Sequence, residues 1–243
     1  MIETESEIAG RRLQPSDPLP FRCHSGLACF NACCRDKRLT LLPYDALRLS
    51  RALGLGTARF LAERAVLEIE PGSGWPTLRL ALADDGRCPF VGGAGCGVYS
   101  DRPTCCRIYP LARAVRPGSG GGVEAIFVAE ATGSRCLGFG APATLTVEEW
   151  TRDQGLDAYR DANDRAARLF LDPRRPRPLA LSPDDVHAVV MALYNLDVFR
   201  EFASRPGFAA RSGIEADAVA RALASDEALL ALGQEWLARR LFG

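Results

Sequence analysis

The stretch of sequence that decides the fold runs from Phe21 to Asp36 and reads FRCHSGLACFNACCRD. It contains four of the nine cysteines of the chain, which are Cys23, Cys29, Cys33 and Cys34. The other five are Cys88, Cys96, Cys105, Cys106 and Cys136, and no cysteine follows residue 136. We therefore expect the chemistry of this protein to lie in the N-terminal part of the chain.

The setting of these cysteines favours free thiols over disulfides. Residues 1–19 contain no apolar run typical of a secretory signal, and no stretch approaches the roughly 18 apolar residues that span a bilayer. We therefore expect a cytoplasmic protein with no membrane partner, whose thiols stay reduced and act as metal ligands or catalytic groups. Consecutive Cα atoms lie about 3.8 Å apart, which is shorter than the roughly 4.4–6.8 Å of a disulfide. The adjacent pairs Cys33–Cys34 and Cys105–Cys106 are therefore poor disulfides.

The composition is that of an ordinary globular protein, with 243 residues, 47% hydrophobic and 25% charged. Its 30 basic and 30 acidic residues cancel, so the chain lacks the basic surplus of a general nucleic-acid binder. We expect no nucleic-acid partner.

The pattern of apolar residues, glycines and prolines predicts an α+β fold. We expect a cysteine-rich metal-binding unit with a small antiparallel sheet, followed by a helical C-terminal unit. The expected ranges are 1–20 for an extended lead-in, 21–145 for the cysteine-cluster domain and 146–243 for the helical region.

Local signals predict several elements within these ranges. Pro43 and Gly54 bound a helix over 43–53, and a second helix follows Thr57. Alternating leucines predict a strand over 76–82, with a turn at residues 84–86. The other expected elements are a hairpin of strands 111–116 and 123–130, a helix opened by a Thr146–Glu149 capping box, a helix from Ser182 towards Phe202, and a helix from Ser225 to about Leu241.

Thiolates are soft ligands, which select zinc, copper(I) or iron–sulfur clusters over calcium and magnesium. Eight or nine thiols exceed the four that one zinc ion or one 4Fe-4S cluster needs, so either two centres exist or some cysteines are structural. Glycines beside Cys96 and Cys136 allow the backbone to approach a centre, as amide hydrogen bonds to cluster sulfurs require. These features favour an iron–sulfur cluster over zinc. Arginines adjacent to cysteines would lower thiol pKa values, and they are Arg22, Arg35, Arg87, Arg107 and Arg135.

Three blocks of sequence resemble the YkgJ-type cysteine cluster family, the CxxCxxCC zinc- or iron-chelating domain. The first is FRCH at 21–24, CFNACCRD at 29–36 and LPYDALRL at 42–49. The second is CPF at 88–90, CGVY at 96–99, RP at 102–103 and CRIYP at 106–110, and the third is Cys136 with its glycines. The resemblance covers about residues 21–140.

The resemblance implies a set of metal-binding thiols, which are Cys23, Cys29, Cys33, Cys34, Cys88, Cys96, Cys106 and Cys136. Cys105 is extra to the pattern. The family includes flagellin lysine N-methylase, so the resemblance also implies an iron–sulfur-dependent protein lysine N-methylation with S-adenosylmethionine as methyl donor and a protein as substrate. No strand–GxGxxG–helix unit is present, so the metal cluster is expected to help hold the donor.

Two other functions stay open. One is a zinc-binding structural or interaction module without catalysis, in which the metal ties the cysteine loops together. The other is an electron-transfer or iron-handling protein. His24 is a weaker candidate ligand than the eight thiols. No Ser/His/Asp or Cys/His nucleophile set is apparent, so catalytic residues are unassigned.

Overall fold

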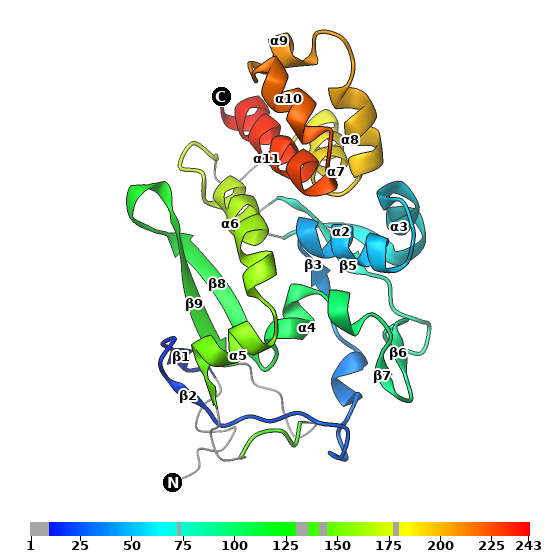
Figure 1. Ribbon diagram of the computed structural model, residues 1–243, viewed down its shortest axis with the longest axis vertical. Helices are drawn as coiled ribbons and strands as arrows, with labels where there is room; N and C mark the ends of the chain where they lie inside the picture. The colour runs from blue at the N-terminus through cyan, green and yellow to red at the C-terminus, as the bar shows by residue number, and fades with distance from the viewer. Residues whose placement is uncertain (1–9, 72–73, 130–135, 141–144, 177–179) are drawn as a thin grey trace. The chain divides into compact units, whose positions relative to one another are not determined.

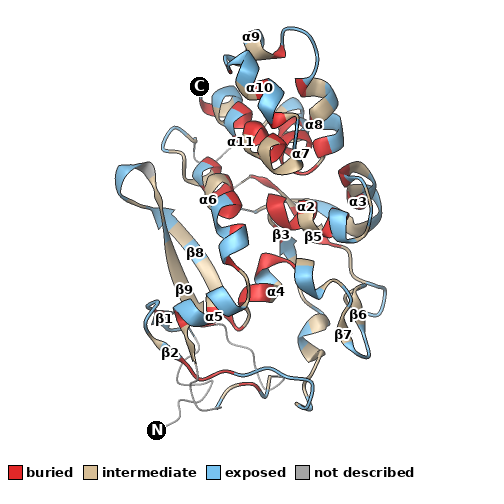
Figure 2. Ribbon diagram, viewed as in Figure 1, coloured by how far each residue is buried: buried red, intermediate tan, exposed pale blue. Residues whose placement is uncertain are grey.

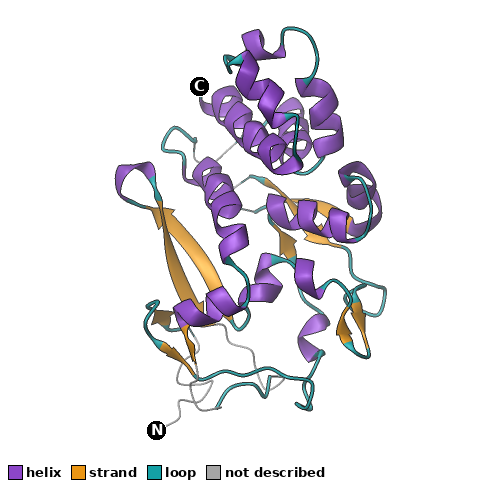
Figure 3. Cartoon of the chain, viewed as in Figure 1, coloured by secondary structure: helices purple, strands orange, loops and turns teal. Residues whose placement is uncertain are grey.

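The computed structural model describes residues 10–71, 74–129, 136–140, 145–176 and 180–243. It divides into two compact units, each made of two stretches of chain. The first unit comprises Met1–Leu39 and Ala81–Arg160, and the second comprises Thr40–Leu80 and Asp161–Gly243. Short antiparallel strands and many helices confirm the expected α+β class, and the C-terminal region is helical (Figure 3).

These units divide the chain differently from the expected ranges 1–20, 21–145 and 146–243. Residues 40–80 group with the C-terminal helices instead of with the cysteine loops. The reason is a shared core: helix α2 (Pro43–Ala52) contacts helix α11 (Asp226–Phe242), and strand β5 (Pro76–Leu80) contacts helix α7 (Pro183–Leu193).

The first unit is built on a long hairpin of β8 (Leu111–Pro117) and β9 (Val123–Ala129), as predicted. Strand β1 (Arg12–Leu13) extends this sheet along β9, in the order β1-β9-β8 (Figure 1). Glu130, the expected end of the second strand, lies outside the described residues. The smaller elements are β2 (Pro18–Leu19), β6 (Val91–Gly92), β7 (Gly95–Cys96), β10 (Leu145–Thr146), the 3₁₀ turns η1 (Ala32–Cys34), η2 (Tyr99–Asp101) and η3 (Ser119–Gly121), and helices α4 (Thr104–Ile108) and α5 (Val147–Asp153).

The core of the first unit surrounds the Phe21 ring. This ring meets Phe139 and Trp150 edge-on, with centroids 5.1 and 5.5 Å away. Ile108 at the end of α4 and Leu111 at the start of β8 are buried in the same cluster, and Cys136 packs against it. The apolar cluster therefore fixes the ends of three cysteine-bearing segments.

The second unit contains a sheet in the order β3-β5-β4 and most of the helices. Its other elements are β3 (Thr40–Leu41), β4 (Ala65–Ile69), α3 (Thr57–Arg64), α8 (Leu196–Ala203), α9 (Phe208–Ser212) and α10 (Ala216–Ala222). The boundary between the units, at Arg160, falls within α6 (Asp157–Leu171). Figure 2 shows buried residues along α7 and α11, where Val189, Leu229 and Leu237 are fully covered.

Local signals for two helices are confirmed in detail. Pro43 opens α2, the Asp45 carboxylate accepts a hydrogen bond from the Leu42 amide at 3.0 Å, and Gly54 follows the helix with a φ of 64°. In α5 the Thr146 hydroxyl accepts from the Glu149 amide at 3.2 Å, while Glu149 accepts from the Thr146 amide at 2.8 Å. The contacts at the two helix starts satisfy amides that would otherwise have no partners.

Two expectations needed correction. The single helix predicted from Ser182 towards Phe202 is two helices, α7 and α8. Tyr194 interrupts them with a φ of −130°, its buried hydroxyl donating to the Leu41 carbonyl at 3.4 Å, and Asn195 caps the second helix. The strand β4, directly after α3, was not predicted, because only its pairing with β5 selects it.

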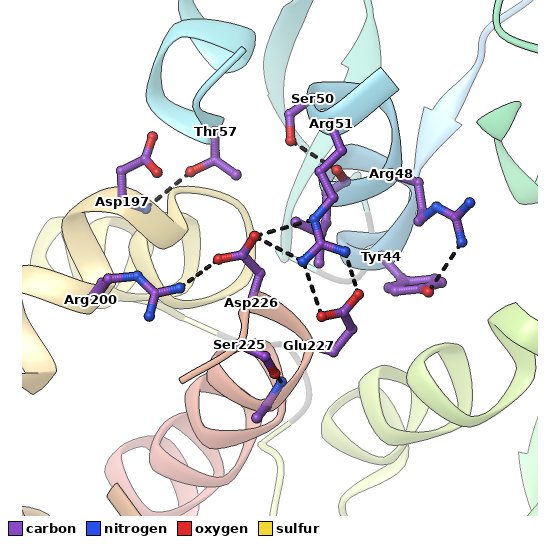
Figure 4. A network of polar contacts seen from close by, with 12 residues as sticks. Tyr44, Arg48, Ser50, Arg51, Thr57, Asp197, Arg200, Ser225, Asp226 and Glu227 are labelled. Carbon is purple, nitrogen blue, oxygen red and sulfur yellow. Dashed lines mark hydrogen bonds and ion pairs between the residues drawn. The ribbon is translucent and has the colours of Figure 1, made fainter. Parts of the chain in front are cut away.

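A polar network joins three helices within the second unit (Figure 4). Arg51 of α2 donates to Asp226 at 2.9 Å and to Glu227 at 3.0 Å, both in the first turn of α11. Arg200 of α8 donates to the other oxygen of Asp226.

Within the described ranges, no helix is both long and apolar enough to cross a bilayer.

Candidate metal centre

The segment from Cys23 to Cys34 is a series of tight turns. The Leu27 amide donates to the His24 carbonyl at 3.1 Å, and the Phe30 amide donates to the Leu27 carbonyl at 2.9 Å. Asn31 takes a left-handed conformation with a φ of 67°, which asparagine tolerates better than most residues, and η1 follows it. The turns bring four cysteines into a short space without a regular helix.

The Cys34 end of this loop pairs with the segment around Cys88. The Cys88 amide donates to the Cys34 carbonyl at 2.8 Å, and the Asp36 amide donates to the Gly86 carbonyl at 2.9 Å. Arg35 and Arg87 form an isolated antiparallel bridge between these two contacts. Backbone hydrogen bonds therefore hold Cys34 beside Cys88 although 54 positions separate them in the sequence.

Cys96 lies opposite Val91 in the two-residue hairpin of β6 and β7. The Val91 amide donates to the Cys88 carbonyl at 3.2 Å, and the Gly97 amide donates to the Phe90 carbonyl at 2.8 Å. Cys88 and Cys96 are thus held by one small hairpin. Gly95 has a φ of 114°, in the left-handed range that glycine adopts without strain.

Cys106 lies in α4, whose position is set by two buried arginines. Arg107 donates to the carbonyls of Arg102 at 3.1 Å and Gln154 at 2.8 Å, and to the Tyr159 hydroxyl at 3.1 Å. Arg102 donates to the Gln154 side chain at 2.6 Å and stacks 3.8 Å above the ring of Tyr99. Buried guanidinium groups need several acceptors, and these arginines obtain them from the turns around α4.

The segment at Cys136 returns to the start of the first cysteine loop. The Leu137 amide donates to the Cys29 sulfur at 3.2 Å, and the Arg22 amide donates to the Gly138 carbonyl at 2.9 Å. A Cβ atom on Gly138 would lie 2.6 Å from the Phe21 ring, so a larger residue there would force a shift in the packing. An amide hydrogen bond to a cysteine sulfur is the contact that stabilises a thiolate ligand.

Four thiols form a first thiol set, which is Cys23, Cys29, Cys33 and Cys136. Burial raises the pKa of Cys23, and repulsion from Cys33, Cys29 and Cys136 raises it further. Leu137, next to Cys136, also donates to the Cys29 sulfur, which places these thiols in one neighbourhood.

Four others form a second thiol set, which is Cys34, Cys88, Cys96 and Cys106. Burial raises the pKa of Cys88, and so does repulsion from Cys106 and Cys96. Burial also raises the pKa of Cys96, with a further contribution from Cys106. The pKa of Cys34 is raised mainly by its hydrogen bond with Cys33 and by burial, and further by Cys88 and Cys106. The Cys88 amide also donates to the Cys34 carbonyl, which keeps Cys34 beside the Cys88 hairpin.

The two thiol sets meet at Cys33 and Cys34. The Cys34 thiol donates a hydrogen bond to the Cys33 thiolate, which lowers the pKa of Cys33 to about 6 and raises that of Cys34. Lys37, the only lysine of the chain, contributes to the lowering at Cys33 through its charge. The pair therefore holds one proton between two sulfurs over a wide pH range.

Three of the arginines expected to act on thiols have other partners. Arg35 donates to the Asp85 carbonyl at 2.6 Å, Arg87 donates to the Asp85 carboxylate at 2.6 Å, and Arg107 is engaged by carbonyls. Arg135 lies outside the described residues. Lys37 acts on Cys33 and Arg102 acts on Cys96 instead, and neither is adjacent in sequence to the thiol it affects.

The thiols are neighbours without standing in coordination geometry. Among the described residues, no three Cys, His, Asp or Glu side chains are close enough to hold a metal ion as they stand. His24 uses its ring Nδ1 to accept from the Gly26 amide at 3.2 Å. Cys105 is exposed on α4 and is not among the thiols that shift the pKa values of the two sets.

A hollow of about 570 Å³ opens beside the second thiol set. Its wall includes Cys34, Arg35, Asp36 and Arg87, together with the backbone of Gly92 and Gly93. We call it the thiol hollow. Its volume is in the range of small-molecule sites, and its charged groups are of both signs.

These features define a cysteine-rich α+β domain that gathers thiols from three segments of chain. Residues 22–132 match the family model CxxCxxCC, described as "Putative zinc- or iron-chelating domain". The matched residues make up less than half of the chain and end before Cys136. No curated protein and no solved structure matches the chain. The expected resemblance is therefore confirmed over residues 22–132.

Proposed function

We propose that this protein binds two metal centres, one in each thiol set. Two contacts carry the proposal: the Leu137 amide joins the Cys136 segment to the Cys29 sulfur, and the Cys88 amide joins the Cys88 hairpin to the Cys34 carbonyl. Four thiolates are the full ligand set of a structural zinc ion or of a 4Fe-4S cluster. The residues therefore fit such a group in number and in chemistry.

Iron–sulfur clusters are the proposed occupants, with zinc as the alternative at the same thiols. The Leu137 amide already donates to the Cys29 sulfur, the kind of contact that stabilises a cluster ligand. Two-cluster ferredoxins also use one cysteine run for two clusters, as Cys33 and Cys34 would here. A bound cluster would supply redox chemistry, and a reversible redox couple would favour electron transfer over a structural zinc module.

The test is the metal content of three serine variants prepared alongside the wild type. Cys29→Ser removes a ligand of the first thiol set and Cys96→Ser removes one of the second, so each is expected to lose about half of the metal. Cys105→Ser is the matched control and keeps all of it. Loss of all metal in both Cys29→Ser and Cys96→Ser would indicate a single centre. Full retention of metal in either of these two variants would contradict the assignment of its cysteine as a ligand.

We also propose that the thiol hollow holds S-adenosylmethionine for the methylation of a protein lysine. The methyl donor carries an amino acid group, whose carboxylate suits Arg35 or Arg87 and whose ammonium suits Asp36. The neighbouring Cys34 would place the donor beside the second metal centre.

Saturable binding of S-adenosylmethionine to the metal-loaded protein tests this second proposal. Arg87→Gln is expected to weaken binding about tenfold, the value of one charge-assisted hydrogen bond. Arg116→Gln, an exposed change on β8, is the control. Absence of saturable binding would reject the donor site and leave the metal proposal to its own test.

A further inference from the structure

A second hollow lies in the second unit, among residues of α6, α10 and α11. Its volume is about 520 Å³, within the roughly 300–1,000 Å³ of small-molecule sites. Buried apolar side chains form part of its wall, including Leu169, Ala222 and Leu232. We call it the helical hollow. It contains no cysteine and is distinct from both thiol sets.

Three arginines line this hollow, and they are Arg165, Arg168 and Arg221. Within the described part of the chain, none of them forms an ion pair or a side-chain hydrogen bond. Arg165 and Arg168 also lie three positions apart on α6, where like charges destabilise a helix. Among the described residues, these three guanidinium groups are therefore left without an acceptor.

The two acidic residues of the wall do not neutralise these arginines. Asp172 accepts from the Arg174 guanidinium at 2.9 Å, and Glu235 accepts from Arg239 at 2.8 Å. Neither Arg174 nor Arg239 lines the hollow. Because each carboxylate is already paired with an arginine outside the hollow, the three arginines of the wall leave a surplus of positive charge.

The wall also holds two buried polar atoms without partners. Gln234 is 4% exposed, and its amide nitrogen donates to the Ala162 carbonyl at 3.5 Å. Its Oε1 and the Nε of Arg165 have no hydrogen-bond partner among the described residues. Such atoms are rare in folded proteins, because an unmade buried hydrogen bond costs about 1–3 kcal/mol.

We propose that the helical hollow binds a small organic anion with an apolar body. A carboxylate or phosphate group would accept hydrogen bonds from Arg168 and Arg221, and Arg165 would add its charge. The apolar body would cover Leu169 and Leu232. This site does not depend on the metal centres or on the methyl donor.

Isothermal titration of the full, metal-loaded chain tests the site with four probes. Octanoate and octyl phosphate carry both an anion and an apolar body, acetate carries the anion alone, and 1-octanol carries the apolar body alone. We expect saturable binding at one site for octanoate, for octyl phosphate or for both. The probe with the higher affinity identifies the headgroup as a carboxylate or a phosphate. Binding of 1-octanol as tight as that of both anions would overturn the proposal, as would no binding of either anion.

Arginine variants locate the site. Arg168→Gln and Arg221→Gln change exposed side chains, and each is expected to weaken octanoate or octyl phosphate binding about tenfold. Arg59→Gln is the matched control, because Arg59 is an exposed arginine of the same unit that pairs with Glu63 and does not line the hollow. Equal binding by all three variants would place the anion elsewhere and overturn the assignment.

Discussion

Cys33 and Cys34 follow one another in the chain, yet they belong to different thiol sets. Cys33 lies near Cys23, and Cys34 lies near Cys88 and Cys106. A trans peptide separates their Cα atoms by about 3.8 Å, too little for a relaxed disulfide. Adjacency therefore keeps both sulfurs available as ligands and fixes the two proposed centres next to each other.

The shared proton of this pair predicts an unusual pH dependence of alkylation in the metal-free protein. The pKa of Cys33 is lowered from 9.0 to about 6, so its thiolate forms as the pH rises through about 6 and disappears below it. One thiol of the pair should therefore react with iodoacetamide at pH 7, while its partner stays protonated until well above pH 9.

Mass spectrometry of the peptide containing both cysteines, at a series of pH values, measures this reaction. Cys34→Ala removes the donated hydrogen bond and should move the midpoint towards the ordinary cysteine value. A wild-type midpoint near pH 9 would show that the hydrogen bond between the two thiols does not form.

A second prediction at this scale concerns Gly138. Replacing it with alanine places a methyl group 2.6 Å from the Phe21 ring and 3.0 Å from the Arg22 carbonyl. We expect Gly138→Ala to lower the free energy of unfolding by about 1–3 kcal/mol. It should also reduce metal content, because it displaces the segment that carries Cys136.

Urea unfolding and metal analysis of the same sample measure both effects. Gly93→Ala is the control, because no atom lies within 4 Å of the added carbon and the backbone there is not left-handed. Wild-type stability in Gly138→Ala would show that Phe21 and the Cys136 segment do not pack as described.

The sequence predicts the candidate site only in part. The eight proposed ligand thiols follow from the family resemblance of the sequence. Their division into two sets does not, because it depends on backbone contacts such as the one from the Cys88 amide to the Cys34 carbonyl. The cation at Cys33 cannot be predicted from adjacency, because Lys37 lies four positions further along the chain and acts on the thiol through space.

Among the elements, α4 links the chemistry most directly to the packing of the first unit. It carries Cys106, and the Arg107 side chain ties it to Gln154 and Tyr159. Arg107→Lys keeps the charge but offers fewer donors in a different geometry, so carbonyl acceptors lose partners. We expect the free energy of unfolding to fall by about 2–4 kcal/mol.

Metal content separates a local effect from general unfolding in this variant. At a temperature where Arg107→Lys stays folded, the metal of the second thiol set should bind more weakly than that of the first. Arg116→Lys on β8, which changes an exposed arginine paired with Glu124, should match the wild type. Equal loss from both sets would contradict the link between Arg107 and Cys106.

Elements with strong local signals were predictable. Pro43 and the Thr146–Glu149 box set helix starts through contacts within four residues, and the glycine-rich turn after β8 defines the hairpin. Strand β4 and the interruption at Tyr194 could not be predicted in this way. β4 depends on pairing with β5, and Tyr194 on a buried contact with Leu41.

At the scale of the whole molecule, the two units differ in what holds them together. The second unit has its own aromatic core of Phe199, Phe202, Phe208 and Trp236, with centroids 5.3 to 6.4 Å apart. In the first unit, Cys136 is the one cysteine among the described residues that packs against the apolar cluster around Phe21. Metal would therefore contribute mainly to the order of the first unit.

Removal of metal is expected to loosen the first unit selectively. Hydrogen–deuterium exchange after chelation should rise over residues 21–39 and 86–106, while α7 and α11 keep their protection. After chelation, Cys105→Ser should show the same hydrogen–deuterium exchange as the wild type. Unchanged exchange in the cysteine segments would show that metal does not order them.

The central claim is that two groups of four thiols hold two metal centres, and the most direct measurement is metal and acid-labile sulfide analysis of protein purified without oxygen. Two 4Fe-4S clusters predict about eight iron and eight sulfide per chain, with absorption near 400 nm. Two zinc ions per chain without sulfide would support the two thiol sets and would identify zinc as the bound metal. One metal centre per chain, or none, would contradict the account.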